Sequence, residues 1–303
     1  MKKFVTAMCF ILLAGLLLFM VGFSIFVING GYDMSDLKKI EQEIEFNENS
    51  NLTISSEIED ITINVIDGDK IKFSYYENEK LAHSFSNEGN EIELKMKRIN
   101  WLFNFFRLMG HNKLSVNVGV PSNFKGNLTL STQTGDVNVN GLSNLKNINI
   151  KIATGDATVA NIGAVNGEFV ATTGDINVEN AQFGNDLQIK LTTGDIRAYN
   201  VKANNEFIAK ATTGDVKCEI DCPVVTFNTS TGDIKFKAIN SNAIKVKCST
   251  GSIKGEVVGN EADYDIKSST TVGKSNLKNK DVEGGKSLNC STTTGSINVQ
   301  FIS

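Results

Sequence analysis

The fold is decided by a short motif, FVATTGDINV, that runs from Phe169 to Val178. Within it, apolar and polar residues alternate on both sides of Gly174. Alternation over a few residues is typical of a half-buried β-strand, and a Gly-Asp step between two such runs is typical of a turn. The motif therefore predicts two short strands that flank one turn.

The same turn recurs along the last two thirds of the chain. Successive copies are 18 to 22 residues apart, and in the first six a Thr-Gly step is followed by Asp. They are centred on Gly135, Gly155, Gly174, Gly194, Gly214, Gly232 and Gly251, with weaker copies at Gly273 and Gly295. Internal periods of this size are the signature of stacked coils. We expect an all-β fold, a β-solenoid of about nine coils of roughly 20 residues, each stacked on the one before it.

Stacking explains why the turn is repeated. Positions seven and five before each glycine are mostly apolar and the third before is mostly small, so we expect these columns to point inward. Coils stacked about 4.8 Å apart bring turn onto turn, and a glycine suits a corner with positive φ. A sandwich of hairpins uses similar strands but does not need identical turns. The predicted turn ladder comprises Thr134, Gly135, Asp136, Gly155, Asp156, Gly174, Asp175, Gly194, Asp195, Gly214, Asp215, Gly232 and Asp233.

The aspartates of the turns form a predicted column of carboxylates, each about 5 Å from the next. Calcium takes oxygen ligands, but the chain has one Asp per coil and lacks the nonapeptide glycine pattern of calcium-binding β-rolls. We expect each Asp side chain to accept N–H bonds within its own turn, with nearby lysines reducing the repulsion. The sequence therefore predicts no metal site and no cofactor.

An uncharged run of 25 residues, from Phe4 to Ile28, precedes the repeats. At about 1.5 Å per residue it is long enough to cross a bilayer core of about 30 Å. Lys2 and Lys3 precede it, so the positive-inside rule predicts a single-pass protein of the cell membrane with a cytoplasmic N-terminus and an extracytoplasmic bulk. A cleaved signal peptide is the alternative. We expect residues 1–30 to be the cytoplasmic tip and transmembrane anchor, residues 31–127 a strand-rich lead-in and cap, and residues 128–303 the repeat solenoid.

One segment of the lead-in is unusually apolar, NWLFNFFRLMG at residues 100–110. We expect it either to cover the open core of the first coil, which protects a sheet edge, or to contact a partner or a membrane. Both interpretations depend on its aromatic side chains, which include Trp101, Phe103, Phe105 and Phe106.

Basic residues flank the turns of the middle coils. They lie four positions before or three positions after a glycine, at Lys190, Lys210 and Lys247 and at Arg197, Lys217, Lys235 and Lys254. We expect one basic stripe that attracts anionic cell-wall polymers or an envelope protein. The alternative is a solvated face whose lysines discourage aggregation. The net charge of −4 does not suggest nucleic acid as a partner.

The cysteines and histidines of this sequence form no catalytic motif. Three cysteines fall in inward columns, and a disulfide between Cys218 and Cys222 is an alternative to free thiols. His83 and His111 lie outside the repeats and have no partner pattern. Because nucleophile and phosphate-loop motifs are also missing, we predict no catalytic residue.

The N-terminal apolar run, a V-x-V-P motif from Val118 to Pro121 and the serial T-x-G-D turns together resemble the bacterial putative-adhesin β-strand-repeat family. This family is a domain of unknown function in membrane-anchored cell-envelope proteins of Gram-positive type. The resemblance covers residues 38–303 and implies a β-solenoid on the outer face of the membrane, although the last two repeats lack Asp. We expect a non-catalytic surface binding module, a putative adhesin. The alternatives are a scaffold or sensor in the cell-envelope stress response and a polysaccharide-active β-helix enzyme.

Overall fold

The computed structural model describes residues 15, 18–22, 24, 37–78, 81–97 and 114–302. They belong to two compact units, Met1–Lys38 and Lys39–Ser303. In the first unit the described residues up to Ser24 are helical and exposed, and no helix among the described residues is long and apolar enough to cross a membrane. Most of the run from Phe4 to Ile28 lies outside the described residues, so the membrane anchor stays a prediction.

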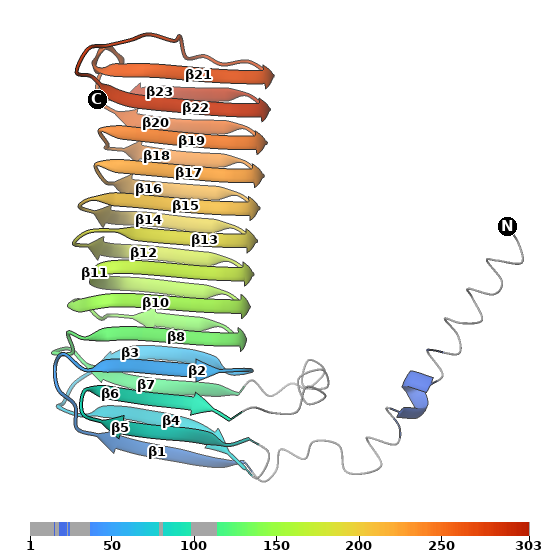
Figure 1. Cartoon of the computed structure of the whole chain (residues 1–303), viewed down its shortest axis with the longest axis vertical. Helices are drawn as coiled ribbons and strands as arrows, with labels where there is room; N and C mark the ends of the chain where they lie inside the picture. Colours follow the sequence, from blue (N-terminus) through green and yellow to red (C-terminus); the bar gives the residue numbers. More distant parts are fainter. Residues whose placement is uncertain are drawn as a thin grey trace, which may run out of the picture. The chain divides into compact units, whose positions relative to one another are not determined.

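The second unit is a parallel β-solenoid, as the repeats predict (Figure 1). Each coil contributes one strand that runs into the glycine turn and one that leaves it. We call the stack of incoming strands the pre-turn sheet and the stack of outgoing strands the post-turn sheet. In Figure 1 the pre-turn sheet lies in front and the post-turn sheet, drawn fainter, lies behind.

The pre-turn sheet is parallel except for its first pairing, in which β5 lies antiparallel to β6. Its order is β5 (His83–Glu88), β6 (Glu91–Met96), β2 (Asn51–Ser56), β8 (Asn127–Thr134), β10 (Leu145–Thr154), the second half of β11 (Ala157–Thr173), β13 (Leu187–Thr193), β15 (Glu206–Thr213), β17 (Val224–Thr231), β19 (Ala243–Thr250), β22 (Lys286–Thr294) and β21 (Tyr264–Val272).

The post-turn sheet is parallel from β7 onward, whereas β4 lies antiparallel to β7. Its order is β1 (Lys38–Ile44), β4 (Ile71–Glu77), β7 (Ser115–Pro121), β3 (Asp60–Ile66), β9 (Val137–Asn140), the first half of β11, β12 (Ile176–Phe183), β14 (Ile196–Ala203), β16 (Val216–Asp221), β18 (Ile234–Ile239), β20 (Ile253–Val258) and β23 (Ile297–Ile302). A 3-10 turn, η1 (Glu261–Asp263), precedes β21.

The inward columns of both sheets form one hydrophobic cluster that runs the length of the stack. Phenylalanines fill its middle, and Phe207 and Phe227 from successive pre-turn strands pack edge to face with ring centroids 6.0 Å apart. Burial of each such side chain stabilises the fold by roughly 1.5–3 kcal/mol. Outward positions of the same strands are polar, so the register is fixed by the alternation that the sequence shows.

The turn glycines combine two constraints. Their φ angles lie between +124° and +153°, a region that L side chains rarely adopt. In addition, a Cβ atom on any of them would lie only 1.8 to 2.3 Å from the carbonyl oxygen of the residue beneath it in the stack. From Gly135 onward, coils can therefore stack at strand spacing only because these corners lack a side chain.

The stack begins one coil earlier than the glycine repeats indicate. β2 and β3 flank a turn in which Glu59 takes the place of glycine, and Gly135 stacks on its carbonyl oxygen. The Asp136 N–H donates to Asp60 Oδ1 at 2.9 Å, so Asp60 is the first member of the aspartate column. This coil has no Thr-Gly-Asp motif, so the repeat pattern does not predict it.

The coils are predicted to stack in chain order, and this expectation is wrong at the C-terminal end. The coil of Gly295 stacks directly on that of Gly251, because β22 pairs with β19 and β23 pairs with β20. β21, which precedes both in the chain, lies outermost on β22. The chain after Gly273 then crosses the end of the stack, where Ile266 and Lys280 form an antiparallel bridge. The equal spacing of the repeats does not reveal this exchange.

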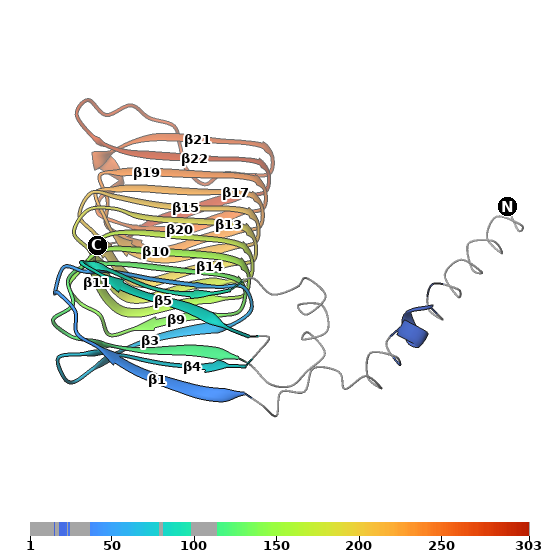
Figure 2. The same ribbon diagram turned by 60° about the horizontal axis from the view of Figure 1, so that its bottom comes forward.

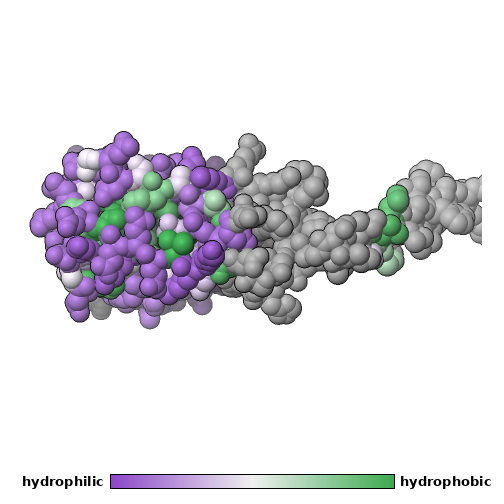
Figure 3. Space-filling view, turned by 90° about the horizontal axis from the view of Figure 1, so that it is seen from below, coloured by the Kyte–Doolittle hydropathy of each residue, from purple (hydrophilic) through white to green (hydrophobic). Residues whose placement is uncertain are grey.

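Antiparallel strands close the other end. Figure 2 brings β1, β4 and β5 forward, and the view from below in Figure 3 shows hydrophobic residues in the middle of the described part of this end, surrounded by hydrophilic ones. Ile40, Phe46 and Phe85 are partly buried hydrophobic residues that pack against the core. The aromatic segment with Trp101, Phe103, Phe105 and Phe106 lies outside the described residues, so its role as cap or contact stays a prediction.

The corner constraint predicts the effect of one methyl group. In Gly214→Ala the new Cβ would lie 1.8 Å from the Gly194 carbonyl oxygen at a φ of +136°, and we expect a loss of roughly 2–4 kcal/mol in the free energy of unfolding. Gly184→Ala is the matched control, because its Cβ meets no atom closer than 3.5 Å. Urea unfolding followed by circular dichroism measures both; equal midpoints for the two variants would contradict the constraint.

Candidate functional site

The turn aspartates form a continuous hydrogen-bonded ladder. Each Asp Oδ1 accepts the backbone N–H of the equivalent residue in the next coil, so the expectation of bonds within the same turn is wrong. The bonds run from Asp156 to Asp136 at 3.0 Å, Asp175 to Asp156 at 2.7 Å, Asp195 to Asp175 at 2.8 Å, Asp215 to Asp195 at 2.9 Å, Asp233 to Asp215 at 2.8 Å and Ser252 to Asp233 at 2.9 Å. The side chain joins neighbouring coils because close stacking brings the next N–H within reach.

Cations bridge the middle of the ladder. Arg197 donates to Asp175 at 2.6 Å and to Asp195 at 2.7 Å, and Lys217 lies 3.5 Å from Asp195 and 3.1 Å from Asp215. Lys235 pairs with Asp233 at 3.5 Å. These contacts offset the repulsion between stacked carboxylates, as the sequence predicts for nearby basic residues.

The ladder also lowers carboxyl pKa values. Burial raises the pKa of Asp175, but the Asp195 N–H and the Arg197 guanidinium outweigh it and hold the pKa below its ordinary value of 3.8. The pKa of Asp215 is lowered in the same way, against burial, by the Asp233 N–H and by Lys217. Both groups therefore favour the charged form in the folded state.

The expected single basic stripe is divided between the two sheets. Its first three members, Lys190, Lys210 and Lys247, lie on the pre-turn strands β13, β15 and β19. The other four share one column of the post-turn sheet, with successive partners Arg197, Lys217, Lys235 and Lys254 on β14, β16, β18 and β20. Residues four positions before a turn glycine and residues three positions after it lie on opposite sides of the turn, so they cannot belong to one column.

Where the ladder loses its aspartate, a cation is left without a partner. Ser252 stands where earlier coils have Asp, and Lys254 has no carboxylate within 4.0 Å among the described residues. Four other exposed lysines also have no carboxylate within 4.0 Å in the described part of the chain: Lys210, Lys237, Lys245 and Lys247. In contrast, Lys190 pairs with Glu168 at 3.3 Å. These five lysines place uncompensated positive charge on the later coils.

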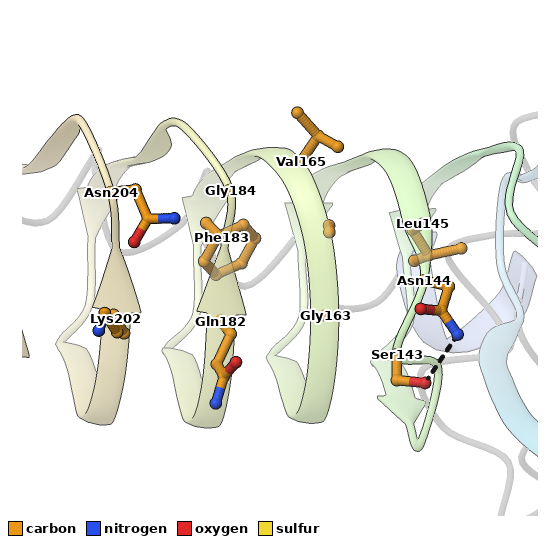
Figure 4. Close-up of a pocket in the computed structure, with 11 residues that line it drawn as sticks. Ser143, Asn144, Leu145, Gly163, Val165, Gln182, Phe183, Gly184, Lys202 and Asn204 are labelled. Atoms are coloured by element: carbon orange, nitrogen blue, oxygen red, sulfur yellow. Dashed lines mark hydrogen bonds between the residues drawn. The ribbon is translucent and has the colours of Figure 1, made fainter.

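A polar hollow of about 530 Å³ lies where post-turn strands return to the next pre-turn strands (Figure 4). Its lining contains hydroxyl and amide groups, among them Asn144, which donates to Ser143 Oγ at 3.2 Å. The one charged lining residue, Lys202, is within 3.8 Å of Asp221. This hollow offers hydrogen bonds but no carboxylate pair.

The structure contains a buried polar cluster that the sequence pattern does not predict. His83 Nε2 lies 3.0 Å from Glu59 Oε2, and both side chains are almost completely buried. Ser56 Oγ donates to the same Glu59 oxygen at 3.0 Å, so the serine is bonded to the carboxylate and not to the imidazole. The only available signal was Glu59 in the place of a turn glycine. His111 lies outside the described residues.

The cysteines behave as core residues. Cys218, Cys222, Cys248 and Cys290 are free and buried, so the alternative of a bond between Cys218 and Cys222 is not formed. Burial raises the pKa of the Cys222 thiol to about 11 and that of Cys290 to about 12. Within the described residues, no group of three or more His, Cys, Asp or Glu side chains is placed to hold a metal ion.

Comparisons with known proteins identify one family and several solved structures of similar fold. The model of the Toastrack DUF4097 family matches residues 49–300. Similar solved structures include a putative lipid binding protein from Parabacteroides distasonis (14% identity, 88% of this chain and 97% of that chain, TM-score 0.46), a putative adhesin from Bacteroides fragilis (13%, 87% and 97%, 0.45) and a putative cell adhesion protein from Clostridium sporogenes (13%, 88% and 100%, 0.31). No curated protein matches the chain.

The ladder geometry predicts different effects for two substitutions of one residue. Asp195→Asn keeps an Oδ1 acceptor for the Asp215 N–H, whereas Asp195→Ala removes it. We expect the alanine variant to be less stable than the asparagine variant by about 1 kcal/mol. Thermal or urea unfolding of both variants measures the difference, and an asparagine variant as unstable as the alanine one would show that the charge, not the acceptor, matters.

The lowered carboxyl pKa values predict acid sensitivity. A carboxyl whose folded pKa is depressed contributes stability above its unfolded pKa, here 3.8, and loses that contribution as the pH falls through the folded pKa. We expect the unfolding midpoint to drop as the pH is lowered below 3.8, and to drop less in Asp175→Asn/Asp215→Asn. Unfolding curves between neutral and strongly acidic pH test this; identical acid limbs would contradict it.

Proposed function

Because the chain belongs to the Toastrack DUF4097 family, we propose that it is a non-catalytic surface module that binds an anionic partner of the cell envelope. The run from Phe4 to Ile28 anchors it in the membrane, and the solenoid lies on the outer side. The names of similar structures, adhesins and a lipid binding protein, are compatible with a binding role.

One observation carries the proposal: the distribution of compensated and uncompensated cations. Arg197 and Lys217 are each held between two ladder carboxylates, so they serve the fold. Lys247 and Lys254 are exposed and have no carboxylate within 4.0 Å among the described residues, so they do not balance the ladder. Surface charges of this kind attract anionic ligands over about 8–10 Å at moderate ionic strength.

A rigid carrier makes weak charges effective. The parallel pairings run from strand to strand between β6 and β21 and between β7 and β23, with register shifts where β14 pairs with β16 and β18 with β20, so the lysines project from one continuous frame. A polyanion that contacts several fixed cations binds more tightly than a polyanion that contacts one, because each contact after the first is intramolecular. An extended anionic polymer of the cell wall fits this arrangement better than a small anion.

The test is binding of the full chain, purified in a non-ionic detergent, to wall teichoic acid at low and high salt. We expect binding at low ionic strength that weakens strongly as salt rises, because exposed charges are screened. Neutral dextran is the control polymer and should not bind. Absence of teichoic acid binding, or binding that salt does not affect, would contradict the proposed function.

A further inference from the structure

A groove of about 350 Å³ lies on the outer face of the post-turn sheet, where the later coils stack. Its lining comes from β14, β16, β18, β20 and β23, so it crosses five neighbouring strands. Two rows of outward side chains form its walls. One row is the column of Lys217, Lys235 and Lys254; the other contains Tyr199 and Lys237.

The charge of the groove is set by where the aspartate ladder stops. Lys217 and Lys235 are paired with ladder carboxylates at one end. Lys254 follows Ser252 and has no carboxylate within 4.0 Å in the described residues, and the same is true of Lys237. Glu256 is the one carboxylate in the lining. Two unpaired ammonium groups and one carboxylate leave the groove with excess positive charge.

Strand alternation places Lys237 on the outer face, because it follows the buried Phe236 along β18, and a bend comes directly after it. The register between β18 and β20 shifts after Phe236, and Ala238 has a φ of 50°. At the corresponding bends of earlier coils the left-handed residue is asparagine, at Asn161, Asn180 and Asn200, which tolerates this conformation better than alanine. Lys237 precedes this bend on the second row and lines the groove together with the uncompensated Lys254 of the first row.

The remaining lining suits carbohydrate. Tyr199, 40% exposed, presents a ring at the β14 end, and Asn298 and Gln300 present amides at the β23 end. Aromatic rings combine an apolar face with a hydrogen-bonding group, and amides both donate and accept hydrogen bonds to hydroxyls. Insertion into a membrane surface would need a broad apolar contact, whereas Tyr199 is the one large exposed hydrophobic residue of this lining.

We propose that this groove binds a segment of a linear glycan that carries phosphate or carboxylate groups. The ring of Tyr199 packs on a sugar, the amides bind hydroxyls, and Lys237 and Lys254 pair with the anionic groups as point charges. The inference rests on the proposed function and deepens it, because it names both the place and the ligand class.

The experiment compares variants of the full chain in binding to wall teichoic acid, a phosphate-bearing polymer, and to polygalacturonate, a carboxylate-bearing one. We expect Lys237→Ala/Lys254→Ala to weaken binding roughly tenfold. The matched control, Lys146→Ala/Lys151→Ala, removes the same charge from the exposed face of β10 and should bind like the unaltered chain. All four lysines are exposed, so the variants are expected to fold, and circular dichroism verifies this.

Tyr199→Ala separates a glycan from a bare polyanion. It should weaken binding of the glycans but leave binding of inorganic polyphosphate unchanged. Preference for one of the two glycans identifies the anionic group. Equal losses in groove and control variants, or groove variants that bind like the unaltered chain, would overturn the groove while the proposed function stands. Tighter binding to phosphatidylglycerol vesicles than to either glycan would also overturn it. If the unaltered chain binds no anionic polymer, the proposed function itself fails.

Discussion

The structure depends on the close approach of successive corners. Each turn glycine lies so near the carbonyl oxygen beneath it that a side chain has no room, and each aspartate then reaches the N–H of the next coil. These two contacts lock the corner of one coil onto the next, so both sheets inherit a common register. Inward columns consequently face inward in every coil, and the hydrophobic core extends without interruption from the first turn to the last.

The same corner decides which charges are free to act. In the middle coils Arg197 and Lys217 lie between stacked carboxylates and offset their repulsion. A row of basic residues in the sequence is therefore a poor guide to a binding surface, because part of it balances the ladder. In the column of Arg197, Lys217, Lys235 and Lys254, charge becomes available to a ligand beyond Asp233, where serine replaces aspartate. Loss of the repeat motif is in this sense more informative about function than the motif itself.

Much of the fold could be predicted from the sequence, because period, alternation and the glycine column all express local geometry. The positive φ of Gly174 follows from its chemistry, and the inward columns follow from their apolarity. Partners across coils could not be predicted. The turn at Glu59 lacks the motif, the acceptor role of Asp136 toward the next coil depends on stacking, and Lys190 and Arg197 proved to lie on different sheets. The burial of His83 against Glu59 involves strands far apart in the chain and leaves no local pattern.

The exchanged order of the last strands has a consequence for how the molecule is completed. From β10 to β20, coils can be added one by one as each new strand finds the edge left by the preceding coil. β21 cannot take its final place in this way, because the surface on which it rests, β22, is made of residues that come later in the chain. The terminal part must instead assemble as a unit, with β22 and β23 entering beneath a strand already synthesised. Until that step occurs, the edges of β19 and β20 remain open to pairing with other chains, so the end of the molecule is exposed to misassembly during folding.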